Sequence, residues 1–230
     1  MVAFRDRALS LPVADALVLA DLHVGRAAAS PVEFPLGERD DLEERLDALL
    51  AATSPGTVVL AGDVLHAFDR VPDGARGTVA ALARLVETAG ADLVVTPGNH
   101  DTMLDAVWDG PTEREYELAD GTVVLHGHDP PERAAGRYVV GHDHPKLTVE
   151  GRDWPCLLYG EGVYEGADVF VLPAFTRLAS GVSVNGRPGR ASLERSPLVT
   201  DVDRFRPVVY DSAADEQRTF PPLGRLRRLR

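Results

Sequence analysis

Asp92-Leu-Val-Val-Thr-Pro-Gly-Asn-His-Asp101 is the stretch from which the fold of this chain can be worked out. It opens with an apolar run typical of a buried strand, so Asn99 and His100 should lie on the loop just beyond the strand's end. Loops in this position carry the chemistry of α/β sheets. An asparagine oxygen can bind a metal ion, a histidine can donate a proton, and Asp101 can fix the tautomer of that histidine. Taken alone, the same residues could form an ordinary Gly-Asn turn.

Two earlier apolar runs end in the same way. Residues 16–20 precede Asp21-Leu-His23, and residues 57–61 precede Gly62-Asp63. An amphipathic helix is expected between these runs, because leucines recur at positions 42, 46, 49 and 50 before Thr53-Ser-Pro-Gly56. A second helix should run from about Gly74 to Gly90. Strands that alternate with helices at this spacing predict a parallel sheet.

The second half of the sequence predicts antiparallel strands. Residues 115–118 and 122–125 flank Asp120-Gly121, a two-residue hairpin signal, and residues 147–150 could pair with 156–159. Further short strands are expected at 169–172, 182–184 and 207–210. We therefore expect one domain with two sheets over residues 1–210. Residues 211–230, with four arginines in the last six positions, are expected to form a flexible tail that either is simply solvated or contacts a substrate strand.

Composition limits the possible classes of protein. The 230 residues can bury a substantial core, and the single Cys156, in an apolar run, is interpreted as a core residue rather than a nucleophile. No signal peptide or membrane-length apolar run is found, which predicts a soluble, cytoplasmic protein. The acidic excess of 36 over 24 is unusual for a protein that holds phosphate backbones.

All seven histidines lie in or near the loops that follow apolar runs. Carboxylate, imidazole and amide oxygen ligands without thiolate suit Mn, Fe or Zn. A single ion would leave several of these groups unpaired, so two metal ions with a bridging carboxylate are predicted. Two such cations acidify a shared water, hold phosphoryl oxygens and stabilise in-line attack. The pattern therefore predicts phosphoester hydrolysis.

The motifs Asp-x-His, Gly-Asp, Gly-Asn-His-Asp, His and Gly-His-x-His, in this order, resemble the calcineurin-like metallophosphoesterase superfamily over roughly residues 16–185. Gly62-Asp-Val-Leu-His66 and Leu172-Pro-Ala-Phe175 look closer to the archaeal phosphoesterases related to SbcD-type DNA repair nucleases. The resemblance implies a mixed α/β fold, a four-layer αββα sandwich of two mixed sheets flanked by helices. It also implies two divalent ions, with manganese expected and iron or zinc as alternatives.

The resemblance further implies a role for each motif residue. The first metal would be held by Asp21, His23, Asp63 and His144. The second would be held by Asp63, Asn99, His126 and His142, with Asp63 as the bridge. His100 would contact the phosphate and protonate the leaving oxygen, oriented by Asp101.

Other polar residues remain open to two interpretations. His66 could position the substrate or only form a hydrogen bond behind the ligands. His128 is interpreted as a surface histidine, and Asp143 as a loop residue that points away. Arg26 and Arg177 could contact phosphate or form surface ion pairs.

The expected function is phosphodiester hydrolysis on DNA, RNA or a nucleotide, as in DNA repair. A phosphomonoesterase, a nucleotide pyrophosphatase and a non-catalytic scaffold are the alternatives. A homo-oligomer or a repair partner is compatible with the sequence, and a membrane partner is not expected.

Overall fold

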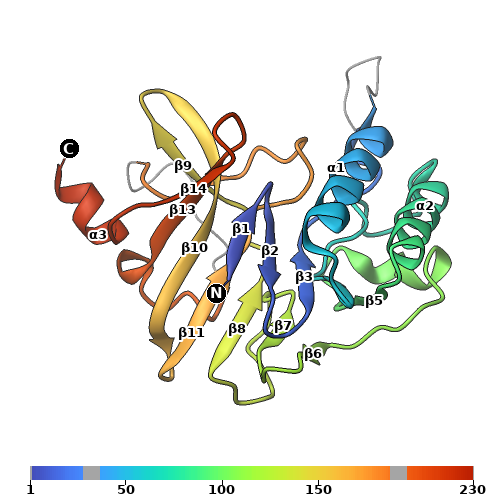
Figure 1. Ribbon diagram of the computed structural model, residues 1–230, viewed down its shortest axis with the longest axis horizontal. Helices are drawn as coiled ribbons and strands as arrows, with labels where there is room; N and C mark the ends of the chain where they lie inside the picture. Colours follow the sequence, from blue (N-terminus) through green and yellow to red (C-terminus); the bar gives the residue numbers. More distant parts are fainter. Residues whose placement is uncertain (1, 28–36, 187–195, 230) are drawn as a thin grey trace.

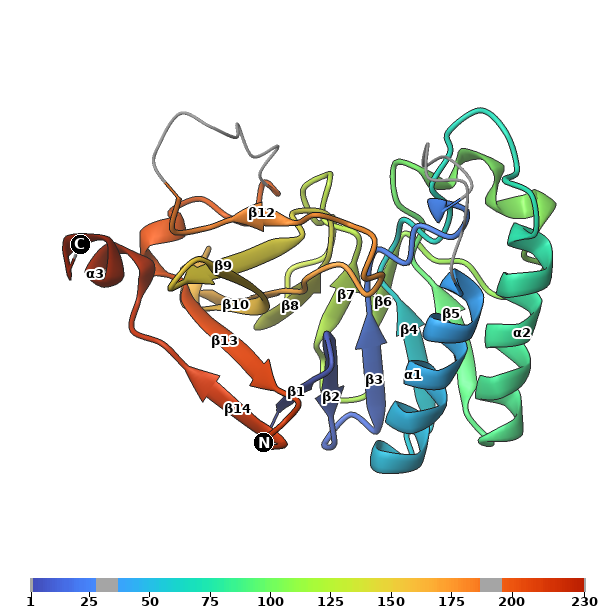
Figure 2. The same cartoon turned by 90° about the horizontal axis from the view of Figure 1, so that it is seen from above.

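The computed structural model describes residues 2–27, 37–186 and 196–229, which form two mixed sheets packed face to face (Figures 1 and 2). The first sheet has the strand order β1 (Ala3–Arg5), β2 (Ala8–Leu11), β3 (Ala16–Leu19), β4 (Thr57–Leu60) and β5 (Asp92–Val95). Strands β3, β4 and β5 are parallel, and helices α1 (Glu38–Thr53) and α2 (Ala75–Thr88) connect them. These three strands and two helices confirm the prediction for the first half of the chain.

The second sheet contains the remaining strands of the described residues. Its order is β12 (Val182–Ser183), β9 (Pro145–Val149), β10 (Arg152–Tyr164), β11 (Ala167–Val171), β8 (Arg137–Val140), β7 (Val123–Leu125) and β6 (Glu115–Glu117). Strand β13 (Arg206–Asp211) pairs with β10, and β14 (Glu216–Thr219) pairs with β13. Strands β7, β8 and β11 are parallel, while the β6–β7 pair is antiparallel, as predicted.

Side-chain alternation along the central strands creates three separate cores. In β3, Leu17 and Leu19 face the helices, whereas Val18 faces the second sheet. In β8, Val139 faces the first sheet, and Tyr138 and Val140 face outward. The outer face of the second sheet is covered by the segment around η3 (Val202–Arg204) and by α3 (Leu223–Leu226). The predicted four layers are therefore present, because a period of two sends successive side chains to opposite faces.

Three details of the second half differ from the sequence prediction. Leu147 pairs with Trp154 rather than with residues 156–159, which instead pair with β11 and β13. Strand β12 is parallel to β9, not antiparallel. The long β10 also takes β13, which is distant in the sequence, as a partner, and a local hairpin pattern cannot predict such non-local pairing.

The prediction of a loose tail from residue 211 is also wrong for the described residues. Residues 216–219 form β14, and residues 223–229 form α3 and the 3₁₀ turn η4 (Arg227–Leu229). Leu223 is fully buried against the second sheet. The partly buried Phe220 and Leu226 pack against the same core, and the backbone N–H of Leu223 donates to the carbonyl oxygen of Phe205 at 2.9 Å. Arg230 lies outside the described residues.

Candidate metal centre

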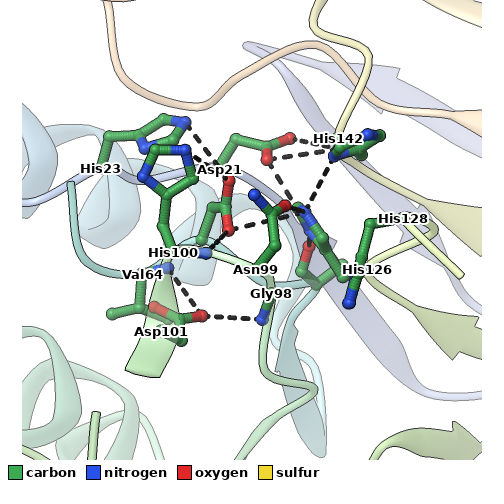
Figure 3. Close-up of polar contacts among 12 residues, drawn as sticks. Asp21, His23, Val64, Gly98, Asn99, His100, Asp101, His126, His128 and His142 are labelled. Carbon is green, nitrogen blue, oxygen red and sulfur yellow. Dashed lines mark hydrogen bonds and ion pairs between the residues drawn. The ribbon is translucent and has the colours of Figure 1, made fainter. Parts of the chain in front are cut away.

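The predicted ligands gather where parallel strands from both sheets end (Figure 3). Asp21 and His23 follow β3, Asp63 follows β4, Asn99 and His100 follow β5, His126 follows β7, and His142 and His144 follow β8. The carboxyl ends of parallel strands meet at one edge of a sheet. Packing the two sheets face to face therefore brings these loops together.

The backbone of these loops is strained. Five residues have positive φ: Asp21 (57°), His23 (46°), Asp63 (48°), His142 (67°) and His144 (44°). Such conformations cost on the order of 1–3 kcal/mol each and persist where the surroundings enforce them, typically at functional sites. This strained backbone conformation turns the side chains of the loops toward a common centre.

Two glycines make room for the ligands. A Cβ on Gly62, which has φ 78°, would lie 2.3 Å from Nδ1 of His126. A Cβ on Gly98 would lie 2.2 Å from Oδ1 of Asp63. The Gly-Asp and Gly-Asn-His motifs are therefore explained by close packing around the ligands as well as by the ligands themselves.

One group of ligand atoms comes from Asp21, His23 and His144, and these atoms lie within 4.8 Å of one another. Nε2 of His144 is 3.1 Å from Oδ1 of Asp21 and 3.3 Å from Nε2 of His23. Asp21 is fully buried, whereas the side chain of His144 is 19% exposed. This is the set predicted to hold the first metal together with Asp63.

A second group surrounds His126. Its Nε2 lies 3.2 Å from Oδ1 of Asn99 and 3.2 Å from Nδ1 of His142. Its Nδ1 lies 3.1 Å from the carbonyl oxygen of Ala61, which places the ring's N–H there and leaves Nε2 with a lone pair. These three side chains are the ones predicted to hold the second metal with Asp63.

The carboxylate of Asp63 lies between the two groups. Its Oδ1 is 3.5 Å from Nε2 of His126, and its Oδ2 is 3.8 Å from Nε2 of His23. The backbone N–H of His100 donates a 2.9 Å hydrogen bond to Oδ1. A carboxylate that faces both groups has the position a bridge requires, and bridging itself stays a prediction.

Burial controls the charge of the centre. It lowers the pKa of His23 to about 3 and that of His142 to about 4, so both rings are neutral at pH 7. Burial also raises the pKa of Asp63 to about 6. For Asp21, burial pushes the pKa upward, but His144, His126 and His23 outweigh it and the pKa is lowered. Metal ligation needs neutral imidazoles and ionised carboxylates, so His23 and His142 are already in the binding form. Burial lowers the pKa of His144, but the adjacent Asp21 carboxylate outweighs this effect and the pKa is raised.

The donor set fits divalent cations. Imidazole nitrogens face each other at 3.2 and 3.3 Å, and carboxylates stand between them. The Nδ1 atom of His23 is buried without a hydrogen-bond partner in the described structure. Nitrogen and oxygen donors without thiolate are the ligands of Mn, Fe and Zn sites. Cations at these positions would pair with lone pairs that the protein leaves facing one another.

His100 is held in a way the sequence did not predict. Its Nδ1 lies 2.7 Å from the carbonyl oxygen of His66, and its Nε2 lies 3.8 Å from Oδ2 of Asp63. Asp101, expected to orient this ring, instead accepts hydrogen bonds from the backbone N–H groups of Val64 (3.2 Å), Leu65 (2.9 Å) and Gly98 (2.9 Å). The carboxylate of Asp101 therefore connects the loops after β4 and β5, and the carbonyl of His66 orients the His100 ring.

The outer rim of the site is formed by His66 and Phe68. Nitrogens of His23, His66 and His100 lie within 4.8 Å of one another. The ring of Phe68 stacks on His100 with centroids 3.8 Å apart, and Phe68 is 50% exposed. Sequence reasoning missed Phe68, because a single aromatic residue in a polar loop has no periodicity or motif that distinguishes it.

The remaining polar residues lie around the centre. His128 is exposed, as expected. The buried carboxylate of Asp143 accepts the backbone N–H of Ser196 at 3.1 Å, which agrees with a structural role. Arg177 forms an ion pair with Asp41 at 2.8 Å, and Arg26 donates to the carbonyl oxygen of Leu178 at 3.2 Å. Cys156 is fully buried in the core.

Comparison with known families agrees with this geometry. The model of the calcineurin-like phosphoesterases matches residues 15–160, which include the loops from Asp21 to His144. The chain belongs to the calcineurin-like phosphoesterase family. It is therefore a metal-dependent hydrolase of phosphoester bonds, and the family depends on a dinuclear metal centre. The phosphoesterase contains no helix long and apolar enough to cross a membrane in the part of the chain described.

The fold of this phosphoesterase is also similar to a solved structure, that of the Pseudomonas putida nuclease MPE. The two chains superpose with a TM-score of 0.63 and 23% sequence identity, over 94% of this chain and 92% of the other. At this identity the likeness establishes the fold. No curated protein matches the sequence. The expected closeness to archaeal SbcD-related enzymes stays a prediction.

Proposed function

We propose that this phosphoesterase hydrolyses phosphodiester bonds whose leaving group is a nucleoside, in nucleic acid or in a nucleotide. The observation that carries the proposal is the arrangement of His100, His66 and Phe68 at the rim of the ligand cluster. A proton donor beside the metal ligands is useful where the leaving oxygen is a poor leaving group. An exposed aromatic ring beside that donor suits a leaving group that carries a base.

The chain's own residues divide the work of the reaction. Bound divalent cations would supply a Lewis-acid centre that holds phosphoryl oxygens and acidifies water. Asp21, His23, Asp63, Asn99, His126, His142 and His144 would hold these cations. His100 binds the phosphate through Nε2 and donates the proton from that atom to the leaving oxygen. The carbonyl oxygen of His66 accepts a hydrogen bond from the Nδ1–H of His100 and so stabilises the charged imidazolium that precedes proton transfer.

Phe68 provides a stacking surface. One face of its ring covers His100, and half of the residue remains exposed to solvent. Stacking of a base on an aromatic side chain is worth about 1–3 kcal/mol. A nucleoside leaving group would therefore gain binding energy that a simple alkyl or mineral phosphate would not, which favours a nucleotide-containing diester over a small monoester.

A substrate panel with a matched histidine pair tests the proposal. The manganese-loaded enzyme is assayed on bis- and mono-nitrophenyl phosphate and on oligonucleotides, together with His100→Ala and the control His128→Ala. We expect cleavage of diesters and oligonucleotides, and a loss of about a hundredfold to ten-thousandfold in kcat for His100→Ala. The loss should shrink as the leaving group improves, because a good leaving group needs no proton.

Four results would contradict the proposal. Turnover of monoesters alone would identify a phosphomonoesterase, and pyrophosphate cleavage without diester cleavage would identify a nucleotide pyrophosphatase. An equal loss of kcat for leaving groups of widely different pKa would show that His100 is not the proton donor. Retention of metal by an inactive wild-type protein would support a scaffold.

A further inference from the structure

A cavity of about 260 Å³ adjoins the metal centre at His144. Three of its lining side chains are cationic, Arg7, Lys146 and Arg177, and one is a carboxylate, Asp153. This local excess of positive charge contrasts with the net charge of −12 of the whole chain, in which Lys146 is the only lysine. The position beside a predicted metal ligand makes the cavity accessible to a substrate held at the centre.

The wall of the cavity is fixed to the metal loops. The segment between β11 and β12 crosses from the second sheet to α1 (Figure 2), where Arg45 donates to the carbonyl oxygen of Phe175 at 2.6 Å. The backbone N–H of Phe175 donates to Ala20 at 2.8 Å, and that of Val182 donates to His144 at 2.8 Å. Arg7 donates to the carbonyl oxygen of Ala174 at 3.1 Å. The cationic wall and the ligand loops are therefore parts of one hydrogen-bonded unit.

The cations in this wall have capacity left for an anion. Lys146 pairs with Asp153 at 2.7 Å and Arg177 pairs with Asp41 at 2.8 Å, and each pair has one exposed and one partly buried partner. Ion pairs open to solvent contribute only about 0–1 kcal/mol. Each guanidinium has five donors, so one carboxylate leaves most of them available. Burial and, to a smaller extent, the nearby Arg45 lower the pKa of Arg7 to about 10, and a bound anion would stabilise the charge of this guanidinium.

We propose that this cavity is a subsite for a second phosphate group of the substrate, adjacent to the phosphate at the metal centre. The inference rests on the proposed function and names the part of a nucleic-acid strand that the enzyme binds. A diester with a single phosphate has no group that could occupy the cavity. A nucleic-acid strand, or a nucleotide with an additional end phosphate, has a second phosphate that could bind there.

Salt dependence of binding tests the subsite without relying on turnover. Fluorescence anisotropy measures the Kd of a labelled single-stranded oligodeoxynucleotide for metal-loaded protein carrying His100→Asn, so that the strand stays intact. Removing one phosphate contact should lower the slope of log Kd against log salt by about 0.7. Because the cavity would hold a single phosphate, we expect part of this reduction for Arg177→Gln and the whole of it when Lys146→Gln is added.

Arg218→Gln is the matched control. Arg218 is 58% exposed and pairs with Asp211 at 3.1 Å, much as Arg177 is 59% exposed and pairs with Asp41. Arg218→Gln removes one positive charge, as Arg177→Gln does, but Arg218 lies on β14, outside the cavity lining. The control should retain the slope measured without either substitution. A lower slope for Arg177→Gln alone would then result from the loss of a charge inside the cavity rather than from the change in net charge.

The outcomes separate the subsite from the proposed function. Equal slopes for Arg177→Gln and Arg218→Gln, or no strand binding by the metal-loaded protein, would overturn the subsite. A lowered slope for Arg177→Gln, together with a wild-type protein that binds strands but does not cut them, would retain the subsite and overturn the nuclease function. A parallel titration with a 5′-phosphorylated dinucleotide shows whether an end phosphate or an internal one occupies the cavity.

Discussion

At the scale of single residues, Asp63 combines burial and a strained backbone with a position between the two groups of ligands. Its carboxylate is buried, its φ is 48°, and it faces ligands of both groups. Burial raises the pKa of this carboxyl from 3.8 to about 6, so an ionised Asp63 destabilises the metal-free fold at neutral pH. The energy is regained only when cations neutralise the charge, which couples folding stability to metal binding.

Substitution of Asp63 by asparagine should therefore have opposite effects in the two forms of the protein. Without metal at pH 8, above the folded pKa, Asp63→Asn should raise Tm by about 2–8 °C, because the buried charge is gone. With metal, the variant should lose occupancy of both sites and turnover, whereas His144→Ala should chiefly lose one metal. Metal analysis and thermal melts measure both effects. Two fully bound metals in Asp63→Asn would exclude the bridging role.

At the scale of elements, the site depends on loops that approach more closely than side chains normally allow. Gly98 follows β5 and lies against Asp63 after β4, where a Cβ would also be 2.5 Å from the Asp63 backbone nitrogen. The hydrogen bonds of Asp101 to Gly98 and Val64 hold the same two loops together. Neither loop can move apart without breaking these bonds.

Gly98→Ala should therefore displace the Asp63 loop and weaken metal binding by at least tenfold, with a loss of stability of about 1–3 kcal/mol from overpacking. Gly136→Ala is the matched control, because nothing lies within 4 Å of a Cβ at that position. Isothermal titration with manganese and thermal melts compare the two variants. Wild-type affinity in Gly98→Ala would show that the loops have more freedom than their contacts indicate.

The same elements show how far sequence reasoning reaches. Strands β3, β4 and β5 were predictable because each is an apolar run whose last two residues are buried, and the ligand types after them could be recognised from their spacing. The β1–β2 hairpin was missed, and β14 has only exposed residues, so no hydrophobic pattern marks it. Other features depend on contacts between residues that are distant in the sequence, which sequence patterns do not record. These features are the pairing of β10 with β13, the His66 carbonyl that orients His100, and the hydrogen bonds of Asp101 to backbone N–H groups.

At the scale of the whole molecule, three cores hold four layers, and the last layer is completed by the carboxyl terminus. Helix α3 lies at the end of the molecule away from α1 and α2 (Figures 1 and 2). Leu223 is fully buried there, and Arg227 pairs with Asp203 and donates to the carbonyl oxygen of Val184 at 2.8 Å. Arg225, Arg227 and Arg228 therefore lie on a docked segment rather than on a tail free to reach the metal centre.

Removal of residues 221–230 should consequently act on stability before it acts on substrate binding. Loss of a buried leucine costs about 2–5 kcal/mol, so Tm should fall by at least about 4 °C. The double variant Arg225→Gln/Arg228→Gln, which removes two exposed charges and keeps Leu223, should retain the wild-type Tm and the wild-type KM for oligonucleotides. Thermal melts and cleavage assays across a salt titration distinguish the two roles. A raised KM for oligonucleotides in the charge variant, at unchanged Tm, would show that the terminal arginines contact the strand. An unchanged Tm in the truncated protein would show that α3 does not stabilise the core on the outer face of the second sheet.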